Sequence, residues 1–236
     1  FDQARDVDVR AWSALISGYA QNGQPNEALK VFDEMCERNV KPDEFIMVSL
    51  MSACSQMGSF ELCEKVDSYL HKRVNKFTSH YVIPALIDMN VKCGHMERAA
   101  RLFEEMPRRD LVSYCSMMEG MAIHGCGGEA VRLFERMVDE GTVPDKVAFT
   151  VILKVCGQAG LVEDGLRYFE LMRKEYSIVA SPDHFSCVVS LLSRSGKLEE
   201  AYELIKSMPV EANVSAWGSL LGGCSVHGNS EIAEVV

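Results

Sequence analysis

The chain repeats itself at an offset of 102 residues, and the register holds over most of its length. Identical residues coincide at this offset, at Gly18 and Gly120, Phe32 and Phe134, Pro42 and Pro144, Cys54 and Cys156, Gly94 and Gly196, and Met106 and Met208. So many matches in one register are not explained by chance. A period this strict is typical of a solenoid, in which stacked units of one supersecondary design bury a core that no single unit could bury alone.

Each long period contains three shorter units with one pattern, an apolar-periodic stretch, a glycine and a second such stretch. In the first unit the apolar positions keep the 3.6-residue spacing of two amphipathic helices, at Leu15, Ile16, Tyr19, Ala28, Leu29, Phe32 and Met35. Pro42 and Asp43 follow, where proline ends one helix and aspartate can cap the next. Strand signals are scarce. The sequence therefore predicts an all-α solenoid of helix–turn–helix repeats.

Several function classes find no support in the sequence. There are nine cysteines but no Cys-x-x-Cys spacing, and Cys54, Cys156 and Cys224 share one phase of their first helices, as small buried residues do. Acidic residues recur at fixed positions of the second helices, which indicates a solvated outer face. We find no phosphate loop, nucleophile motif or metal-ligand spacing. We therefore expect neither an enzyme nor a cofactor or metal.

The formal net charge is -10, which ordinarily speaks against nucleic-acid binding because phosphate binding rests on positive charge. In a solenoid, however, the two faces are separate surfaces, so the total charge is a poor guide to the inner one. No apolar run approaches the roughly 20 residues that span a bilayer, and we expect no membrane partner. Residues 1–8 look like the tail of an earlier repeat and Val236 falls within a helix pattern, so we expect a piece of a longer protein.

The recurring phrases resemble the pentatricopeptide repeat (PPR), through DVRAWSALISGY (8–19), EALKVFDEM (27–35) and VKPD (40–43). The unit lengths are similar to those of the P, L and S motifs of the plant PLS class. The corresponding motifs are 9–43 (P), 44–79 (L), 80–110 (S), 111–145 (P), 146–181 (L) and 182–213 (S), after 1–8 as the end of a preceding repeat. Residues 214–236, with Trp217-Gly218-Ser219, resemble the start of an E1 motif. The resemblance implies one continuous, right-handed superhelical array.

The resemblance further implies recognition of single-stranded RNA, one nucleotide per motif, by the fifth and last residues of each motif. These pairs are Ser13 with Asp43, Val48 with Ser79, Pro84 with Asp110, Cys115 with Asp145, Thr150 with Ser181, and Ser186 with Asn213. A helical repeat can present two such side chains to one base edge. On position alone, however, Ser or Thr near a helix start and Asp after Pro can equally act only as helix caps.

Under the family's code, a small hydroxyl residue at the fifth position favours a purine. Asp at the last position then favours guanine, and Asn at the last position favours adenine. Ser13 and Asp43 then prefer G, and Ser186 and Asn213 prefer A. Pro84 and Cys115 depart from the usual fifth residues, so only the final Asp of those motifs indicates U or G, and L motifs follow no reliable code. The implied footprint is 5′-G-N-(U/G)-(U/G)-N-A-3′, with an edited cytidine four nucleotides beyond the A.

The second residue of each motif is where the family sandwiches the base. Those positions hold Arg10, Phe45, Tyr81, Val112, Val147 and Asp183. Valine and tyrosine suit this role, whereas Asp183 fits it poorly. Lys92 and Arg194 match positions where the family directs a basic residue at the RNA backbone. With so few basic groups, we expect modest affinity and a shallow dependence on salt.

PLS proteins direct C-to-U editing of transcripts in plant organelles. The resemblance therefore implies organellar RNA as partner, accessory editing proteins of the MORF or RIP type bound along L motifs, and a DYW deaminase domain in cis or in trans. It places the protein in a mitochondrion or chloroplast, with a transit peptide outside this sequence. The alternative is a helical scaffold whose concave face or L motifs bind a protein partner. The low basic charge favours this alternative.

Overall fold

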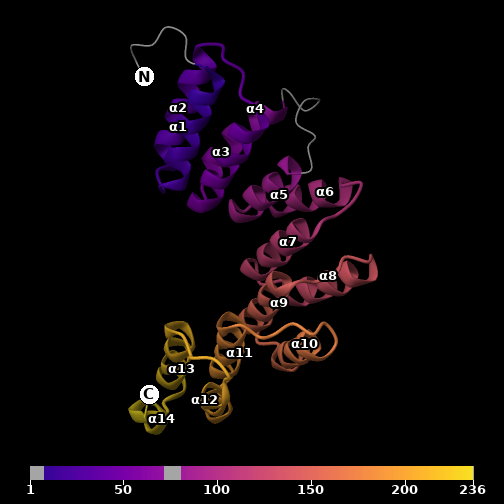
Figure 1. Cartoon of the computed structure of the whole chain (residues 1–236), viewed down its shortest axis with the longest axis vertical. Coiled ribbons are helices and arrows are strands. Elements are labelled where there is room, and N and C mark those ends of the chain that lie inside the picture. The colour runs from indigo at the N-terminus through magenta and orange to yellow at the C-terminus, as the bar shows by residue number, and fades with distance from the viewer. Residues whose placement is uncertain (1–7, 72–80, 236) are drawn as a thin grey trace. The chain divides into compact units, whose positions relative to one another are not determined.

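The computed structural model of the chain describes residues 8–71 and 81–235, and every regular element in those ranges is an α-helix (Figure 1). The helices are α1 (Val9–Gln21), α2 (Pro25–Glu37), α3 (Glu44–Met57), α4 (Phe60–His71), α5 (Val82–Lys92), α6 (Met96–Glu105), α7 (Leu111–Ile123), α8 (Gly127–Asp139), α9 (Lys146–Ala159), α10 (Val162–Lys174), α11 (Pro182–Arg194), α12 (Leu198–Ser207), α13 (Val214–His227) and α14 (Ser230–Val235). The predicted all-α fold of helix–turn–helix repeats is confirmed.

Helix starts and ends follow the predicted capping chemistry. The Asp43 carboxylate accepts a hydrogen bond from the Ile46 amide at 2.9 Å and so caps α3. Asp145 caps α9 in the same way, accepting from the amides of Val147 and Ala148. At the other end, Gly160 ends α9 with a left-handed φ of 68°, a conformation that costs glycine little. The Pro-Asp pairs therefore do mark the junctions between units.

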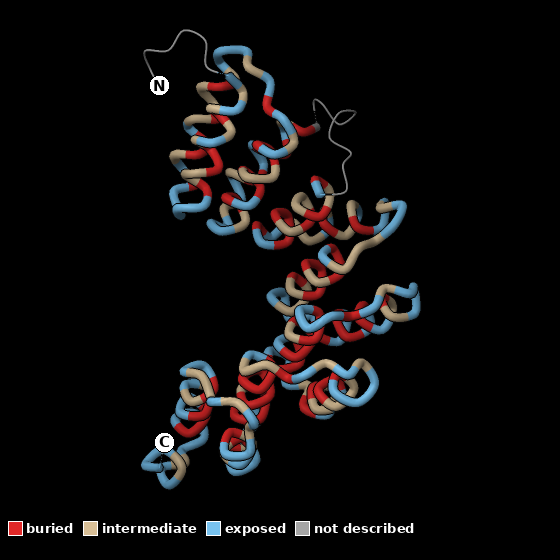
Figure 2. Tube along the Cα trace, viewed as in Figure 1, coloured by how far each residue is buried: buried red, intermediate tan, exposed pale blue. Residues whose placement is uncertain are grey.

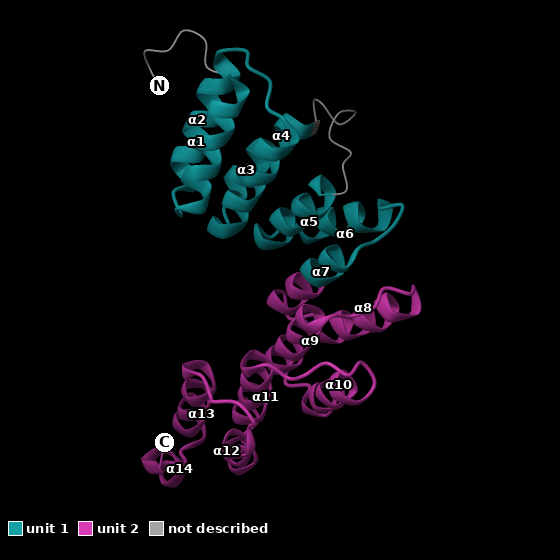
Figure 3. Cartoon of the chain, viewed as in Figure 1, with its two compact units in different colours: residues 1–117 teal, residues 118–236 magenta. Residues whose placement is uncertain are grey.

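The chain divides into two compact units, residues 1–117 and residues 118–236, with the boundary inside α7 (Figure 3). In the first unit α1 packs on α2 and α3, and α3 packs on α5, which in turn packs on α6. In the second unit α9 packs on α8, α10 and α11, and α11 packs on α12 and α13. In both units the first helices of successive repeats stack on one another, so residues at the same phase of neighbouring first helices face a common surface.

Each unit has its own apolar core (Figure 2). Trp12, Phe32 and Met47 are buried in the first, and Phe149 and Leu191 in the second. The run from Val147 to Leu153, which is rich in β-branched residues, lies within α9 and buries Val151, Ile152 and Leu153, so helix packing overrides its strand propensity. No helix among the described residues is long and apolar enough to cross a membrane.

The three cysteines that share one phase, Cys54, Cys156 and Cys224, are buried as predicted. Burial raises the pKa of the Cys54 thiol to about 12, and that of Cys156 to about 12 as well. Because the thiolate is the nucleophile, both should resist alkylation by iodoacetamide in the native chain at pH 8. The exposed Cys126 should react orders of magnitude faster, which mass spectrometry of timed samples would check. Equal rates at Cys126 and Cys156 would contradict the packing role.

Candidate nucleic-acid interface

The second residues of the six predicted motifs are all exposed in the structure. Four of them are apolar or aromatic, with exposed fractions of 62% for Phe45, 54% for Tyr81, 61% for Val112 and 52% for Val147. Arg10 and Asp183 occupy the same position in the first and sixth motifs. Large apolar side chains that recur, exposed, at one phase of a repeat are typical of a binding surface rather than of a core.

In the first unit, Phe45 and Tyr81 line one hollow of about 580 Å³. Val48, the fifth residue of its motif, lines it with Asp43 and Glu44. Phe45 and Val48 come from the first turns of α3, and Tyr81 directly precedes α5, so two neighbouring repeats build the hollow. Aromatic side chains at such a place can stack on a flat ring. Ser79, the predicted partner of Val48, lies outside the described residues.

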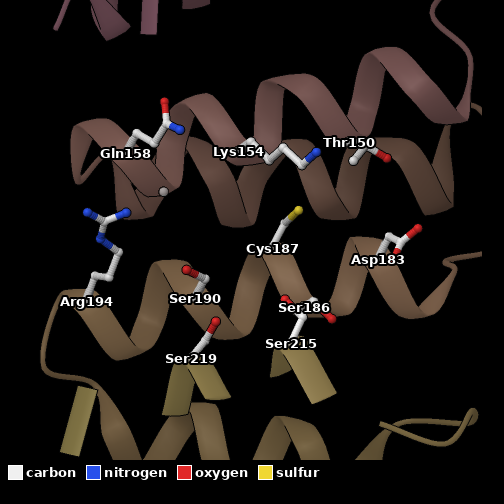
Figure 4. A pocket seen from close by; sticks show the side chains of 11 residues that line it. Thr150, Lys154, Gln158, Asp183, Ser186, Cys187, Ser190, Arg194, Ser215 and Ser219 are labelled. Carbon is white, nitrogen blue, oxygen red and sulfur yellow. The ribbon is translucent and has the colours of Figure 1, made fainter. Parts of the chain in front are cut away.

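In the second unit, a hollow of about 410 Å³ follows the first helices α9, α11 and α13 (Figure 4). The predicted residues Thr150, Asp183, Ser186 and Arg194 all line it. The sequence interpretation gave no binding role to the other lining residues, which are Lys154, Gly157, Gln158, Cys187, Ser190, Ser215 and Ser219. Figure 4 shows Thr150, Lys154 and Gln158 along one helix, at the i, i+4, i+8 spacing that keeps side chains on one face. That spacing was available in the sequence and could have identified Lys154.

One predicted pair is in direct contact. The Ser186 hydroxyl lies 2.7 Å from the Asn213 side-chain oxygen and 2.8 Å from the Pro182 carbonyl, and it can donate to either. The same Asn213 oxygen accepts from the Ala216 amide at 3.0 Å and caps α13. Because the Asn213 oxygen accepts from the Ala216 amide and faces the Ser186 hydroxyl, the amide nitrogen is left as a donor that can face a ligand.

A second pair, Thr150 and Ser181, is linked through His184, which is only 1% exposed. The His184 Nδ1 atom accepts from the Ser181 amide at 3.0 Å, so Nδ1 carries no proton and the Ser181 hydroxyl, 2.9 Å away, donates to it. The proton on Nε2 is then donated to the Lys146 carbonyl at 2.8 Å. That carbonyl also accepts from the Thr150 hydroxyl at 2.9 Å. Both hydroxyl groups thus have an acceptor within the protein.

The remaining predicted pairs differ from these two. No hydrogen bond joins Ser13 to Asp43 within the described ranges, and Pro84 is buried in α5 and has no side-chain donor. Asp110 accepts from the Ser113 amide at 2.8 Å and so also caps a helix. Cys115 and Asp145 belong to different compact units. For Asp43, Asp110 and Asp145 one carboxylate oxygen makes the cap, and the capping interpretation of these residues therefore holds whatever else they bind.

The two predicted backbone-binding cations differ in availability. Lys92 forms an ion pair with Asp88 at 2.9 Å, one turn earlier on α5. Arg194 is exposed at the end of α11 and has no carboxylate partner in the part of the chain that the structure describes. Arg194 is therefore the freer of the two to meet a phosphate.

Charge is divided between the two helices of each repeat. Counting Lys and Arg against Asp and Glu, the odd-numbered helices from α1 to α13 carry a net charge of +1, and the even-numbered helices from α2 to α14 carry -11. Nearly all the acidic excess therefore lies on second helices, as expected from the sequence, and not on the helices that carry the predicted base-reading residues. No group of three or more His, Cys, Asp or Glu side chains among the described residues could hold a metal ion.

Two family models match the chain. The "PPR repeat family" model covers residues 7–56 and 109–158, and the "PPR repeat" model covers 85–111, 147–176 and 183–211. The chain belongs to the pentatricopeptide repeat (PPR) family. The helices α1, α3, α7, α9, α11 and α13 begin at the residues where the predicted motifs begin.

Relatives in Arabidopsis thaliana carry the same family name. A putative PPR-containing protein is 84% identical over 202 residues, which are 86% of this chain and 37% of that protein. A putative mitochondrial member is 37% identical over the whole of this chain, which corresponds to 38% of that protein. A chloroplastic member is 38% identical over 97% of this chain, which corresponds to 28% of that protein. The chain thus spans well under half the length of these relatives.

Solved structures of PPR proteins share the fold. The structure of PPR10 in complex with an 18-nt psaJ RNA element matches 93% of this chain and 38% of its own, with a TM-score of 0.60 and 16% identity. The PPR domain of Arabidopsis thaliana protein-only RNase P 1 in complex with tRNA matches 81% of this chain and 95% of its own, with a TM-score of 0.56 and 18% identity. At such identities the likeness concerns the fold alone.

Proposed function

We propose that the chain binds single-stranded RNA sequence-specifically, with one nucleotide facing each repeat. The observation that carries the proposal is the hollow of the second unit, which Thr150, Asp183, Ser186 and Arg194 line and where Ser186 contacts Asn213. The exposed apolar second residues supply surfaces between repeats on which any base can stack. In this proposal the choice of base comes from the fifth and last residues of each motif. Two structural neighbours were solved with bound RNA, which supports the same proposal.

The proposed footprint remains 5′-G-N-(U/G)-(U/G)-N-A-3′. Its last position rests on the Asn213 amide group, which is oriented by the bonds to Ser186 and Ala216. Its first position rests on Ser13 and Asp43 by family analogy.

Asn213→Asp tests the base reading directly. Aspartate keeps the cap on α13 but replaces the amide donor with a carboxylate oxygen, so the preference at the last nucleotide should change from A to G by about tenfold. Fluorescence anisotropy with two RNAs that differ only in that base would measure it. Asn229→Asp is the matched control, because the Asn229 side chain also caps its helix through the Ile232 amide at 3.0 Å and does not line the hollow. An unchanged preference in Asn213→Asp would contradict the assignment.

We extend the proposal to the role of the whole protein. The P, L and S spacing supports a PLS-class factor that specifies a site of C-to-U editing, with a DYW deaminase domain in cis or in trans. Relatives named mitochondrial and chloroplastic support an organelle as its location. The small number of unpaired cations on the first helices favours help from accessory editing proteins of the MORF or RIP type. A plant that lacks the protein should lose editing at one organellar cytidine, and the native gene should restore it. Unchanged editing in that plant would contradict this role.

A further inference from the structure

Lys154 lies on the same face of α9 as Thr150, one turn further along, and it lines the hollow of the second unit. Figure 4 shows its side chain extending along the hollow toward Thr150. Lys30, Lys92 and Lys174 each pair with a carboxylate on their own helix. Lys154 has no such partner within the described ranges, although Asp183 lines the same hollow. Its ammonium group is therefore free to bind a ligand there.

Both hydroxyl groups of this motif already have an acceptor within the protein. The Thr150 proton goes to the Lys146 carbonyl at 2.9 Å, and the Ser181 proton goes to His184 Nδ1 at 2.9 Å. While these bonds hold, both oxygens can only accept a hydrogen bond from a base. Of the two lysines on α9, only Lys154 lines the hollow, and it places a hydrogen-bond donor one turn from Thr150.

We propose that Lys154 selects the base at the fifth position of the footprint and favours a keto base, guanine or uracil, over an amino base, adenine or cytosine. The inference rests on the proposed RNA binding and adds a residue outside the fifth and last positions. An ammonium group only donates hydrogen bonds, so it suits the O6 and N7 acceptors of guanine and the O4 acceptor of uracil. The exocyclic amino groups of adenine and cytosine are donors themselves and would face the ammonium unfavourably.

The test uses the 236-residue chain and four RNAs of sequence 5′-GAUUXA-3′ with identical flanks, in which X is G, U, A or C. Anisotropy titrations should give about tenfold tighter binding for G and U than for A and C. Lys154→Met should abolish this preference and leave the affinity for A and C within about twofold. Lys146→Met is the matched control, because Lys146 is an exposed lysine of the same helix that does not line the hollow, and it should keep the preference.

Equal binding of all four RNAs by the unaltered chain would overturn the inference while leaving RNA binding intact. A uniform loss in Lys154→Met, with the salt slope reduced by about 0.7, would also overturn it, because that pattern belongs to a phosphate contact. Failure to bind any RNA, with or without an accessory protein, would instead overturn the proposed function together with this inference.

Discussion

Replacing His184 with alanine should lower the free energy of unfolding of the second unit by about 2–4 kcal/mol. The side chain is 1% exposed and bridges the N-terminus of α11 to the first turn of α9 through the Ser181 amide and hydroxyl and the Lys146 carbonyl. Its removal leaves a buried gap and takes the acceptor away from two donors at once. Urea unfolding followed by circular dichroism and by tryptophan fluorescence would measure the loss.

Two further variants separate the network from a general effect of losing a histidine. His124→Ala alters an exposed histidine in a turn and should change stability by less than about 0.5 kcal/mol. His184→Gln should recover part of the loss, because glutamine at this third helical position can still accept from the N-cap amide as in an ordinary capping box. A loss below about 1 kcal/mol in His184→Ala would show that the bridge contributes little.

The helices and their boundaries could be predicted from the sequence because they depend on local chemistry. The apolar period of 3.6 places Ile16 and Phe32 in the core, and the Pro-Asp pairs fix where α3 and α9 begin. The burial of Cys54 and Cys156 follows from the same phase argument. These features need no knowledge of how one repeat lies against the next.

Two hydrogen bonds of the site join residues far apart in the sequence, that of His184 to Lys146 and that of Ser186 to Asn213, and the sequence does not specify them. His184 is three residues after Ser181, a spacing that suggests a cap, but its bond to Lys146 joins residues 38 apart and exists only because α11 packs on α9. Lys154 and Asp183 both line the hollow for the same reason. Which side chains meet in the hollow is therefore decided by packing and not by residue type.

Phe45 and Tyr81 should together account for about a hundredfold of the RNA affinity, since stacking contributes roughly 1–3 kcal/mol per base. Both are more than half exposed and line the same hollow, so Phe45→Ala with Tyr81→Ala should weaken binding without a comparable loss of stability. Because stacking releases no counterions, the slope of log K against log salt should not change. Anisotropy titrations at several salt concentrations would measure both quantities.

Phe60→Ala is the matched control for this pair. Phe60 is also exposed, at 58%, but it stacks on His95 with ring centroids 4.1 Å apart and does not line the hollow. Its replacement should leave RNA affinity within about twofold, because no base is expected to stack there. If Phe60→Ala weakened binding as much as the double variant, the surface near the turns after α3 and α5 would be the binding site instead. If the double variant bound RNA as tightly as the native chain, the proposal that a base stacks between these two repeats would be wrong.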